Sequence, residues 1–273
     1  MFFDKKGDNL ALIIRQDKAI FKKNKINRSW NLDKEYHSIV QNNAGDLFGI
    51  IGNEHLKILN VNSENLQSID VEYGICLCVF HPTEKKIAIT SSIGEIILYD
   101  ISNSKIIKKL DAHIGNVTFL HFSPDGSKML SSGEDNVLIL WDLKNWRKKI
   151  IKNDLIYLSV FSNKVFLRNA GEDSLSLFDF ASETASVPDK KWQENRYRKV
   201  NASDDISAFI GQKEAMIDVW KKQDFIGSFQ VRRGTQIHET AISKDGKFIA
   251  GISEEFQIHI WDVENKRLMA IYE

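Results

Sequence analysis

The feature that most constrains the fold of this chain is an internal repeat. The segment "FSPDGSKMLSSGEDNVLILWD" (122–142) has a second copy in "ISKDGKFIAGISEEFQIHIWD" (242–262). In both copies a turn glycine, Gly126 or Gly246, precedes a tryptophan, Trp141 or Trp261, by 15 positions. Self-similarity at a fixed period is typical of chains built from stacked supersecondary units. The repeat therefore predicts an array of equivalent small modules.

Weaker copies extend the repeat over the rest of the chain. An apolar or aromatic residue recurs at the position of the tryptophan every 37 to 42 residues. These seven anchor positions are Phe21, Leu59, Tyr99, Trp141, Phe178, Trp220 and Trp261. We therefore expect a single domain over residues 1–273, in seven units with approximate bounds 1–35, 36–70, 71–110, 111–152, 153–198, 199–232 and 233–273.

Each unit carries the pattern of short β-strands. Two or three apolar runs alternate with turn residues such as "SPDG" (123–126), and helical periodicity is almost absent. Runs such as "VLILW" (137–141) and "EIILY" (95–99) are apolar on both faces, so we expect these strands to be covered on both sides. Small sheets of about four strands, packed radially, satisfy that pattern and leave only short edges. The sequence thus predicts an all-β fold of seven small sheets.

Four short motifs together resemble those of the WD-repeat (WD40-type) β-propeller family. They are "AH" (112–113), "SPDG" (123–126), "SSGED" (131–135) and "WD" (141–142). The unit 112–142 matches closely, the unit that ends in "WD" (261–262) matches well, and the other five match by spacing and hydrophobicity. The resemblance implies a seven-bladed β-propeller of four-stranded antiparallel blades.

The resemblance also implies a structural role for four polar or aromatic residues of the fourth unit. In the family, a loop histidine, a second-strand hydroxyl, a turn aspartate and the third-strand tryptophan form a hydrogen-bonded chain. The matching residues are His113, Ser131, Asp135 and Trp141. In two other units Ile93 and Glu255 stand at the position of the turn aspartate, so we expect those blades to depend on packing alone.

A serine, a histidine and an aspartate in one unit also suggest a catalytic triad. We expect Ser131 to be buried between strands, and the chain has no "GxSxG" nucleophile elbow. It also has no histidine or cysteine cluster with metal-ligand spacing and no glycine-rich phosphate loop. Cys76 and Cys78, one residue apart, are expected to be buried free thiols, with a metal or redox pair as the alternative. The sequence predicts a protein that is not an enzyme and holds no cofactor or metal.

The composition argues against a dedicated nucleic-acid or membrane protein. The chain has 37 basic and 37 acidic residues, so it lacks the basic excess typical of nucleic-acid binders. No apolar run approaches the length of a membrane-spanning helix, and "MFFDKKGDNL" (1–10) lacks the apolar region of a signal peptide. We therefore expect a cytoplasmic or other intracellular protein.

Two groups of residues are candidate partner contacts. Glu134 and Glu254 precede equivalent turn positions and should project onto one rim. The polar segment 182–200 combines basic and aromatic residues, which dominate binding hot spots and also suit single-stranded nucleic acid. Its candidate contacts are Lys190, Lys191, Trp192, Arg196, Tyr197 and Arg198. A solvated outer strand is the alternative there, and the basic run 145–152 is expected to be a strand edge guarded by lysines.

These observations favour a non-catalytic scaffold for protein–protein interaction, a subunit or adaptor of a larger complex. We expect a monomeric propeller within a hetero-complex, bound to protein or peptide partners and not to a membrane. One alternative is a subunit of an RNA-containing complex that uses residues 190–199, and another is a propeller hydrolase or lactonase with a metal in the central channel. The first and last blades are expected to meet by face packing or under a partner, because Met1 already aligns within the first strand.

Overall fold

The computed structural model describes the backbone of most of the chain. The described residues are 2–3, 9–15, 18–23, 26–32, 36–153, 155–161, 163–169, 175–186, 199–202, 208–212, 216–221, 224–230, 236–243, 245–255 and 257–272. Every regular element assigned within these ranges is a β-strand. The chain divides into two compact units, Met1–Asn153 and Asp154–Glu273.

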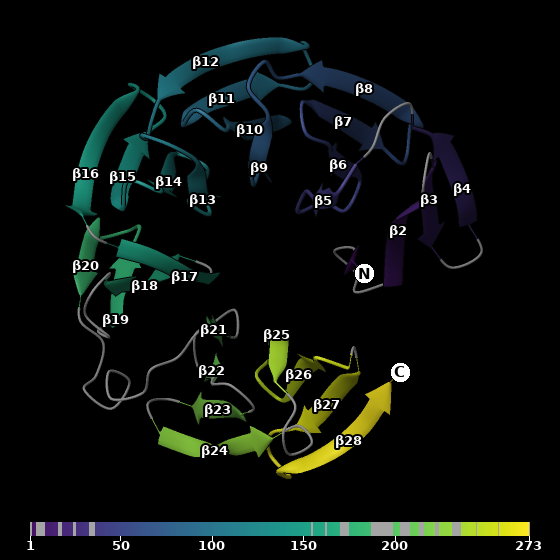
Figure 1. Cartoon of the computed structure of the whole chain (residues 1–273), viewed down its shortest axis with the longest axis vertical. Helices are drawn as coiled ribbons and strands as arrows, with labels where there is room; N and C mark the ends of the chain where they lie inside the picture. The colour runs from purple at the N-terminus through teal and green to yellow at the C-terminus, as the bar shows by residue number, and fades with distance from the viewer. Residues whose placement is uncertain are drawn as a thin grey trace. The chain divides into compact units, whose positions relative to one another are not determined.

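The first unit contains four sheets. Their strands are β1 (Phe2–Phe3), β2 (Asn9–Arg15), β3 (Lys18–Lys23) and β4 (Ile26–Asn31); β5 (Ser38–Gln41), β6 (Leu47–Ile51), β7 (His55–Asn60) and β8 (Asn65–Asp70); β9 (Ile75–Phe80), β10 (Lys86–Ser91), β11 (Glu95–Asp100) and β12 (Lys105–Asp111); and β13 (Val117–Phe122), β14 (Lys128–Gly133), β15 (Val137–Asp142) and β16 (Arg147–Asn153). Figure 1 shows the fourth strands β8, β12 and β16 along the outer side of this unit.

The second unit contains three sheets of the same kind. Their strands are β17 (Leu155–Phe161), β18 (Lys164–Asn169), β19 (Leu175–Asp179) and β20 (Thr184–Ser186); β21 (Lys199–Ala202), β22 (Ala208–Gln212), β23 (Met216–Lys221) and β24 (Asp224–Gln230); and β25 (Ile237–Ile242), β26 (Phe248–Ser253), β27 (Ile258–Asp262) and β28 (Arg267–Tyr272). Each sheet pairs four consecutive strands antiparallel, which confirms the predicted all-β class and the four-stranded antiparallel blades.

The seven anchor positions of the sequence repeat all fall on the third strands of the sheets. Six of them occupy the next-to-last residue of the strand, as Trp141 does in β15. Phe21 differs, because it is the third residue from the end of β3. The anchor of the repeat therefore marks the same position of the third strand in six of the sheets.

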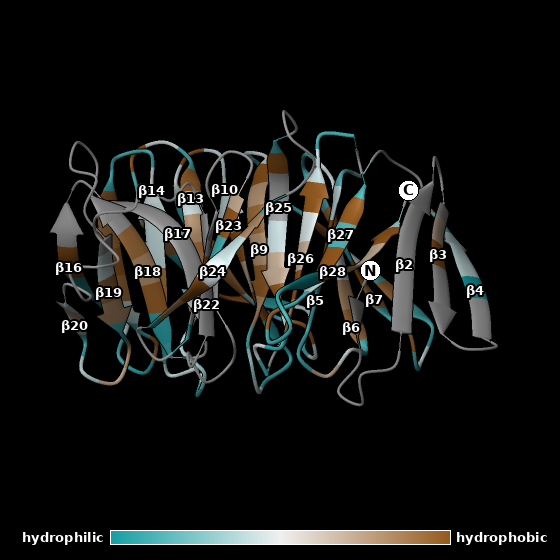
Figure 2. Ribbon diagram, turned by 90° about the horizontal axis from the view of Figure 1, so that it is seen from below, coloured by the Kyte–Doolittle hydropathy of each residue, from teal (hydrophilic) through white to brown (hydrophobic). Residues whose placement is uncertain are grey.

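The core lies between neighbouring sheets and covers the third strands on both sides. In β11 and β15 the four central residues are buried and only the two end residues are partly exposed. One apolar cluster joins residues of the second and third sheets, and another joins the third and fourth. Figure 2 shows hydrophobic colour on strands such as β9 and β18 and hydrophilic colour on the loops. Apolar residues on both faces of a strand are thus explained by a sheet on either side.

The turn glycines adopt the left-handed conformation that the "DG" motif predicts. Gly126 has φ 74° and Gly246 has φ 69°. Each donates its backbone N–H to the carbonyl of the serine three residues earlier, at 2.8 and 2.9 Å. Asp125 accepts hydrogen bonds from the hydroxyls of Ser123 and Ser127 and from the Ser127 N–H, and these bonds lower its pKa to about 2. A positive φ is unfavourable for a residue with a Cβ, so glycine suits this turn.

The two ends of the chain each contribute to the sheet that is local in sequence. Phe2–Phe3 pairs antiparallel with β2, as the first strand of the first sheet. Residues 266–273, predicted to be an outer strand, contain β28, the fourth strand of the last sheet. In the described residues the last sheet is complete without the N-terminal segment. How the first and last sheets meet stays a prediction.

Candidate functional site: a polar network of the fourth sheet

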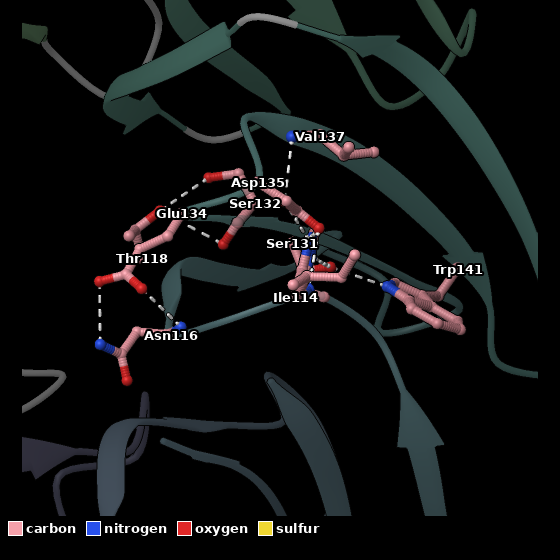
Figure 3. A network of polar contacts seen from close by, with 10 residues as sticks. Ile114, Asn116, Thr118, Ser131, Ser132, Glu134, Asp135, Val137 and Trp141 are labelled. Carbon is pink, nitrogen blue, oxygen red and sulfur yellow. Dashed lines mark hydrogen bonds and ion pairs between the residues drawn. The ribbon is translucent and has the colours of Figure 1, made fainter. Parts of the chain in front are cut away.

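The fourth sheet places the four predicted network residues on neighbouring elements. Ser131 lies on β14 and pairs with Ile139 of β15, two residues before Trp141. Since side chains alternate along a strand, Ser131 and Trp141 are diagonal neighbours on one face. Asp135 lies in the turn between these strands, and His113 lies in the loop that precedes β13. Figure 3 shows the indole nitrogen of Trp141 directed at Ser131, and Glu134 and Asn116 as a separate pair beside them.

These four side chains form one hydrogen-bonded chain. The indole Nε1 of Trp141 lies 2.9 Å from Ser131 Oγ, which lies 2.8 Å from His113 Nε2. The other ring nitrogen, His113 Nδ1, lies 3.0 and 3.2 Å from the two carboxylate oxygens of Asp135. Asp135 also accepts backbone N–H groups from Ile114 and Val137 at 3.0 and 3.1 Å. The carboxylate thus fixes the turn and the histidine loop together.

The protonation states of His113 and Asp135 determine which atom donates and which accepts in each hydrogen bond of the network. Burial lowers the pKa of His113, although the hydrogen bond to Asp135 opposes that shift, so the imidazole is neutral near pH 7. Burial raises the pKa of Asp135, but the N–H groups of Ile114 and Val137 and the bond to His113 together lower it by more, so the carboxylate is ionised. An ionised carboxylate only accepts, so His113 Nδ1–H donates to it. His113 Nε2 then accepts from the Ser131 hydroxyl, whose oxygen accepts from the Trp141 N–H.

This arrangement leaves Ser131 unable to act as a nucleophile. The serine is fully buried, and its oxygen already contacts both the indole and the imidazole. A nucleophilic serine needs an approach path for a substrate carbonyl and a donor pair for the developing oxyanion. The buried Ser131 has no such path in this structure, and the four bonded side chains join the sheet, the turn and the loop.

Glu134 forms a second polar cluster next to this network. Its two carboxylate oxygens accept the backbone N–H and the side-chain amide of Asn116, at 3.0 and 2.9 Å. These bonds lower the pKa of Glu134, with the side-chain bond of Asn116 as the larger cause. The Asn116 amide oxygen in turn accepts from the Cys76 thiol of β9 at 3.3 Å. Asn116 thus ties the third sheet to the fourth, and Glu134, predicted as a partner contact, is exposed and bonded to Asn116.

Asn116 and Thr118 were not identified from the sequence as members of the site. Thr118 Oγ1 lies 3.3 Å from Ser132 Oγ and extends the polar cluster along the sheet edge. A polar residue in a loop has many roles, and only its position three residues after His113 could have drawn attention to Asn116. Glu254, the other predicted rim glutamate, is exposed, and its backbone N–H donates to the Gln236 carbonyl at 3.0 Å.

The third sheet replaces the network with apolar packing and a different polar contact. Ile89 occupies the position of Ser131 and is fully buried, while Ile93 occupies the turn position of Asp135 and is 53% exposed. The anchor residue Tyr99 uses its hydroxyl to accept the Gln67 side-chain amide of β8 at 2.8 Å. This sheet is therefore tied to the preceding one instead of to its own turn.

The last sheet also lacks the hydroxyl at that position. Gly251 stands where the fourth sheet has Ser131, and the ring of Trp261 comes within 3.3 Å of the point where a Cβ would lie. His259 stacks on Trp261 with ring centroids 5.5 Å apart. The tryptophan thus packs over a glycine, so its position is fixed by van der Waals contact.

The remaining predicted residues are those of the basic and aromatic segment and the two cysteines. Lys190, Lys191, Trp192, Arg196, Tyr197 and Arg198 lie outside the described residues. Cys76 is only half-buried, which corrects the expectation of two buried thiols, while Cys78 is buried; both thiols are free, and burial raises the pKa of each. Among the described residues no three His, Cys, Asp or Glu side chains gather as metal ligands would.

In those same ranges no helix has the length and apolarity needed to cross a membrane.

Comparison with known families identifies one repeat directly. The family model for the WD domain, G-beta repeat, matches residues 104–142. These residues include the fourth sheet's first three strands and the whole polar network.

Known proteins match the chain over larger stretches. The small ribosomal subunit protein RACK1y of Oryza sativa subsp. japonica is 30% identical over 141 residues, which are 48% of this chain and 42% of that protein. The transducin beta-like protein 3 of Rattus norvegicus is 38% identical over 72 residues, which are 26% of this chain and 9% of that protein. The matched part is less than half the length of these curated relatives.

Solved structures match nearly the whole chain at low identity. A chain in the crystal structure of the mitotic checkpoint complex aligns with a TM-score of 0.68 at 14% identity, over 95% of this chain and 87% of that chain. The beta-propeller domain of Myceliophteria thermophila Cps50 (Swd1) aligns with a TM-score of 0.67 at 10% identity, over 87% and 86%. These matches confirm the predicted β-propeller fold.

Proposed function

Since the chain belongs to the WD40-repeat β-propeller family, we propose that it is a non-catalytic scaffold for protein–protein interaction. In this proposal it is an intracellular subunit or adaptor of a larger complex, and its seven sheets form one closed, monomeric propeller. The name of one relative supports the proposal, because it describes a subunit protein of the ribosome.

The observation that carries the proposal is the use of His113, Ser131 and Asp135 inside the fourth sheet. Groups that could do chemistry in an open site here bond to one another and to the backbone. The bonds to the ionised carboxylate of Asp135 are charge-assisted, and bonds of that kind contribute about 1.5–3 kcal/mol each to stability. Bonds of this kind make the framework of the sheet rigid. A rigid framework can present its loops to partner proteins, which is the role of a scaffold.

Affinity purification from the source organism tests the proposal. The tagged full chain, cross-linked before lysis, should recover the same small set of proteins in repeated experiments, identified by mass spectrometry. We propose that Trp192 and Tyr197 contribute to this surface, so replacing both with alanine should remove at least one of these proteins. The matched control replaces Tyr272, an exposed tyrosine elsewhere, and should remove none. Recovery of no protein above a tag-only control would contradict the scaffold role.

The enzyme alternative predicts a bound metal in the purified protein. A hydrolase or lactonase of this fold would need several oxygen or nitrogen ligands around one ion. Elemental analysis of protein purified without chelators should find no divalent metal in stoichiometric amount. One equivalent of such a metal, retained through dialysis, would favour the enzyme over the scaffold.

The names of the ribosomal relatives favour a second candidate, a subunit of an RNA-containing complex. In this alternative the arginines of residues 190–199 contact phosphates. Contacts of this kind weaken steeply with salt, because binding releases counterions. Salt-sensitive RNA binding that is lost when Arg196 and Arg198 are replaced by glutamate would favour it. Equal binding by the charge-reversed variant would exclude it.

A further inference from the structure

Three large apolar side chains are exposed at one edge of the third and fourth sheets. Tyr73 in the loop before β9 is 46% exposed, Ile93 in the turn between β10 and β11 is 53% exposed, and Ile114 in the loop before β13 is 84% exposed. In a sheet of four consecutive antiparallel strands, the start of the first strand and the turn between the second and third strands lie at the same edge. We name these three residues the apolar rim.

Backbone hydrogen bonds connect the loops that carry the apolar rim. The Ser92 N–H donates to the Tyr73 carbonyl at 2.9 Å, and the His113 N–H donates to the Gly94 carbonyl at 3.1 Å. These four residues are members of the rim or direct neighbours of its members in the chain. The three loops therefore form one connected surface that extends over both sheets.

Each residue of the apolar rim is followed by a glycine in the left-handed conformation. The φ angles of Gly74, Gly94 and Gly115 are 63°, 86° and 84°. A side chain at Gly94 would clash with the backbone carbonyl of His113, so this glycine lets the turn approach the next loop closely. The tight turns and the bonds between them order the backbone of the rim before any partner binds. A surface that is already ordered loses less entropy on binding.

Turn chemistry does not account for large apolar residues at these positions. Polar residues such as aspartate, asparagine and serine are favoured in turns, because their side chains bond to the nearby backbone. In the fourth sheet Asp135 does so by accepting the N–H of Val137, whereas the third sheet has Ile93 at the equivalent position. Exposed apolar residues that lie together mark interaction surfaces. The apolar rim is therefore a candidate docking surface.

The charges beside the apolar rim are negative. The loops and turns at this edge of the second, third and fourth sheets are residues 52–54, 71–74, 92–94, 112–116 and 134–136. They contain four acidic residues and no lysine or arginine. Lys109 of the adjoining strand β12 lies 3.6 Å from Glu95 of β11, so these two opposite charges compensate each other. The edge as a whole attracts cationic groups and repels anionic ones.

Three of the four carboxylates remain available to a partner. Glu54, Glu72 and Glu134 are exposed. In the part of the chain that the structure describes, neither Glu54 nor Glu72 has a basic side chain within ion-pair distance. Glu134 is bonded to the neutral side chain of Asn116, which leaves its negative charge uncompensated. A partner would therefore meet apolar side chains beside free negative charge.

We propose that the apolar rim binds a basic segment of a partner protein. Large apolar side chains of that segment pack against the three residues of the rim, and its lysine or arginine residues contact Glu54, Glu72 and Glu134. The acidic loops favour such a segment over a nucleic acid or an anionic lipid surface, since like charges repel. The inference rests on the scaffold function proposed above and assigns it a site and a partner chemistry.

Selection from a random peptide display library on the purified full chain tests this inference. The enriched peptides should combine lysine or arginine with at least one large apolar residue. Their affinity, measured by fluorescence polarisation, should fall as salt rises, because exposed charges are screened. Enriched peptides that are acidic, or that lack a large apolar residue, would overturn the proposal.

Three variants place the selected peptide on the molecule. Ile93→Lys and Ile114→Lys each remove an apolar contact and add a positive charge, so each should weaken binding by at least about tenfold. The matched control is Ile106→Lys, since Ile106 is also 53% exposed and lies on β12 of the same sheet, near the opposite edge. It should bind like the unmodified protein.

A further variant tests the contribution of the acidic residues. Glu54→Gln with Glu72→Gln removes two negative charges beside the rim, so it should weaken binding and reduce its salt dependence. Unchanged affinity and salt dependence would show that the charges do not contact the peptide, and would overturn the basic character assigned to the partner.

The remaining outcomes decide whether the peptide binds at the rim. Ile114 is 84% exposed, so its replacement should leave the melting temperature unchanged, and Ile114→Lys decides the test if Ile93→Lys alters folding. Equal binding by Ile114→Lys and the Ile106→Lys control would overturn the rim as the site. Self-association of the chain that Ile114→Lys abolishes, without selection of any basic peptide, would overturn the proposal in favour of a second copy. If no peptide is selected while affinity purification still recovers partners, the rim fails and the scaffold function stands.

Discussion

At the scale of single residues, Asp135 does more for the fourth sheet than its position in a turn suggests. It accepts hydrogen bonds from two backbone N–H groups and from His113, and so connects the turn to the loop before β13. The imidazole of His113 has no exposed side-chain surface. A buried donor that loses its acceptor costs about 1–3 kcal/mol, because water cannot replace the lost bond. The turn residue therefore controls the stability of the whole network.

We expect Asp135→Ala to lower the free energy of unfolding by about 2 kcal/mol, because His113 Nδ1–H and two backbone N–H groups lose their acceptor. The control is Glu255→Ala, at the equivalent and exposed turn position of the last sheet. Urea unfolding followed by tryptophan fluorescence measures both. Equal stabilities of the two variants would show that the network contributes nothing.

The histidines of the fourth sheet predict a loss of stability below neutral pH. Burial lowers the pKa of His121 to about 4 and also lowers that of His113. A histidine in the unfolded chain has a pKa of about 6.5, so the unfolded state takes up protons first as the pH falls. The free energy of unfolding should therefore decrease from about pH 6.5 downward. Asp125 and Asp135, whose pKa values are lowered, lose their contribution only below the unfolded aspartate pKa of about 3.9.

Urea unfolding at neutral and mildly acidic pH separates these contributions. The unmodified chain should be less stable near pH 5 than near pH 7. His121→Asn removes one titrating group from β13 and should make that difference smaller. A variant that loses as much stability as the unmodified chain would show that His121 does not titrate in this range.

At the scale of the elements, contacts between neighbouring sheets also hold the turns in place. His81, which follows β9, is buried, and its Nε2 lies 3.0 Å from the Gly126 carbonyl oxygen in the turn between β13 and β14. Its ring also packs edge-on against Phe122, with centroids 5.0 Å apart. The third sheet thus holds the first turn of the fourth.

We expect Gly126→Ala to destabilise the protein for two reasons. The φ of 74° disfavours any side chain, and the new Cβ would clash with the imidazole ring of His81. Strain of this kind costs about 1–3 kcal/mol before the clash is counted. In a His81→Ala background the clash is absent, so the same substitution should cost less there. Equal costs in both backgrounds, measured by thermal unfolding, would show that the two residues do not interact.

The sequence predicts some elements of this site well and others not at all. The network of Asp135 and Trp141 is predictable because the motifs of residues 112–142 resemble those of the WD-repeat family, and the resemblance implies hydrogen bonds between these positions. The bond between Glu134 and Asn116 is not, since two exposed polar residues carry no periodic pattern. The contact of His81 with Gly126 joins residues 45 positions apart on different sheets, so it depends on packing between sheets. Motifs that recur in the family therefore predict the network within the sheet, whereas bonds outside those motifs and contacts between sheets are missed.

At the scale of the whole molecule, the strand topology of the repeats varies less than the residues at their equivalent positions. The described residues form seven sheets of one topology, yet the turn aspartate of the fourth sheet is an isoleucine in the third and a glutamate in the last. The sheets are instead held by apolar clusters that join one sheet to the next. Such an array tolerates variation in each unit, because stability is shared among many neighbouring interfaces.

Small-angle X-ray scattering of the full chain in solution is the most direct test of the central proposal, that the seven repeats form one closed propeller. A compact domain of 273 residues should have a radius of gyration of about 19 Å and a single maximum in its pair-distance distribution. A much larger radius with two maxima, as two separate bodies would give, would contradict it.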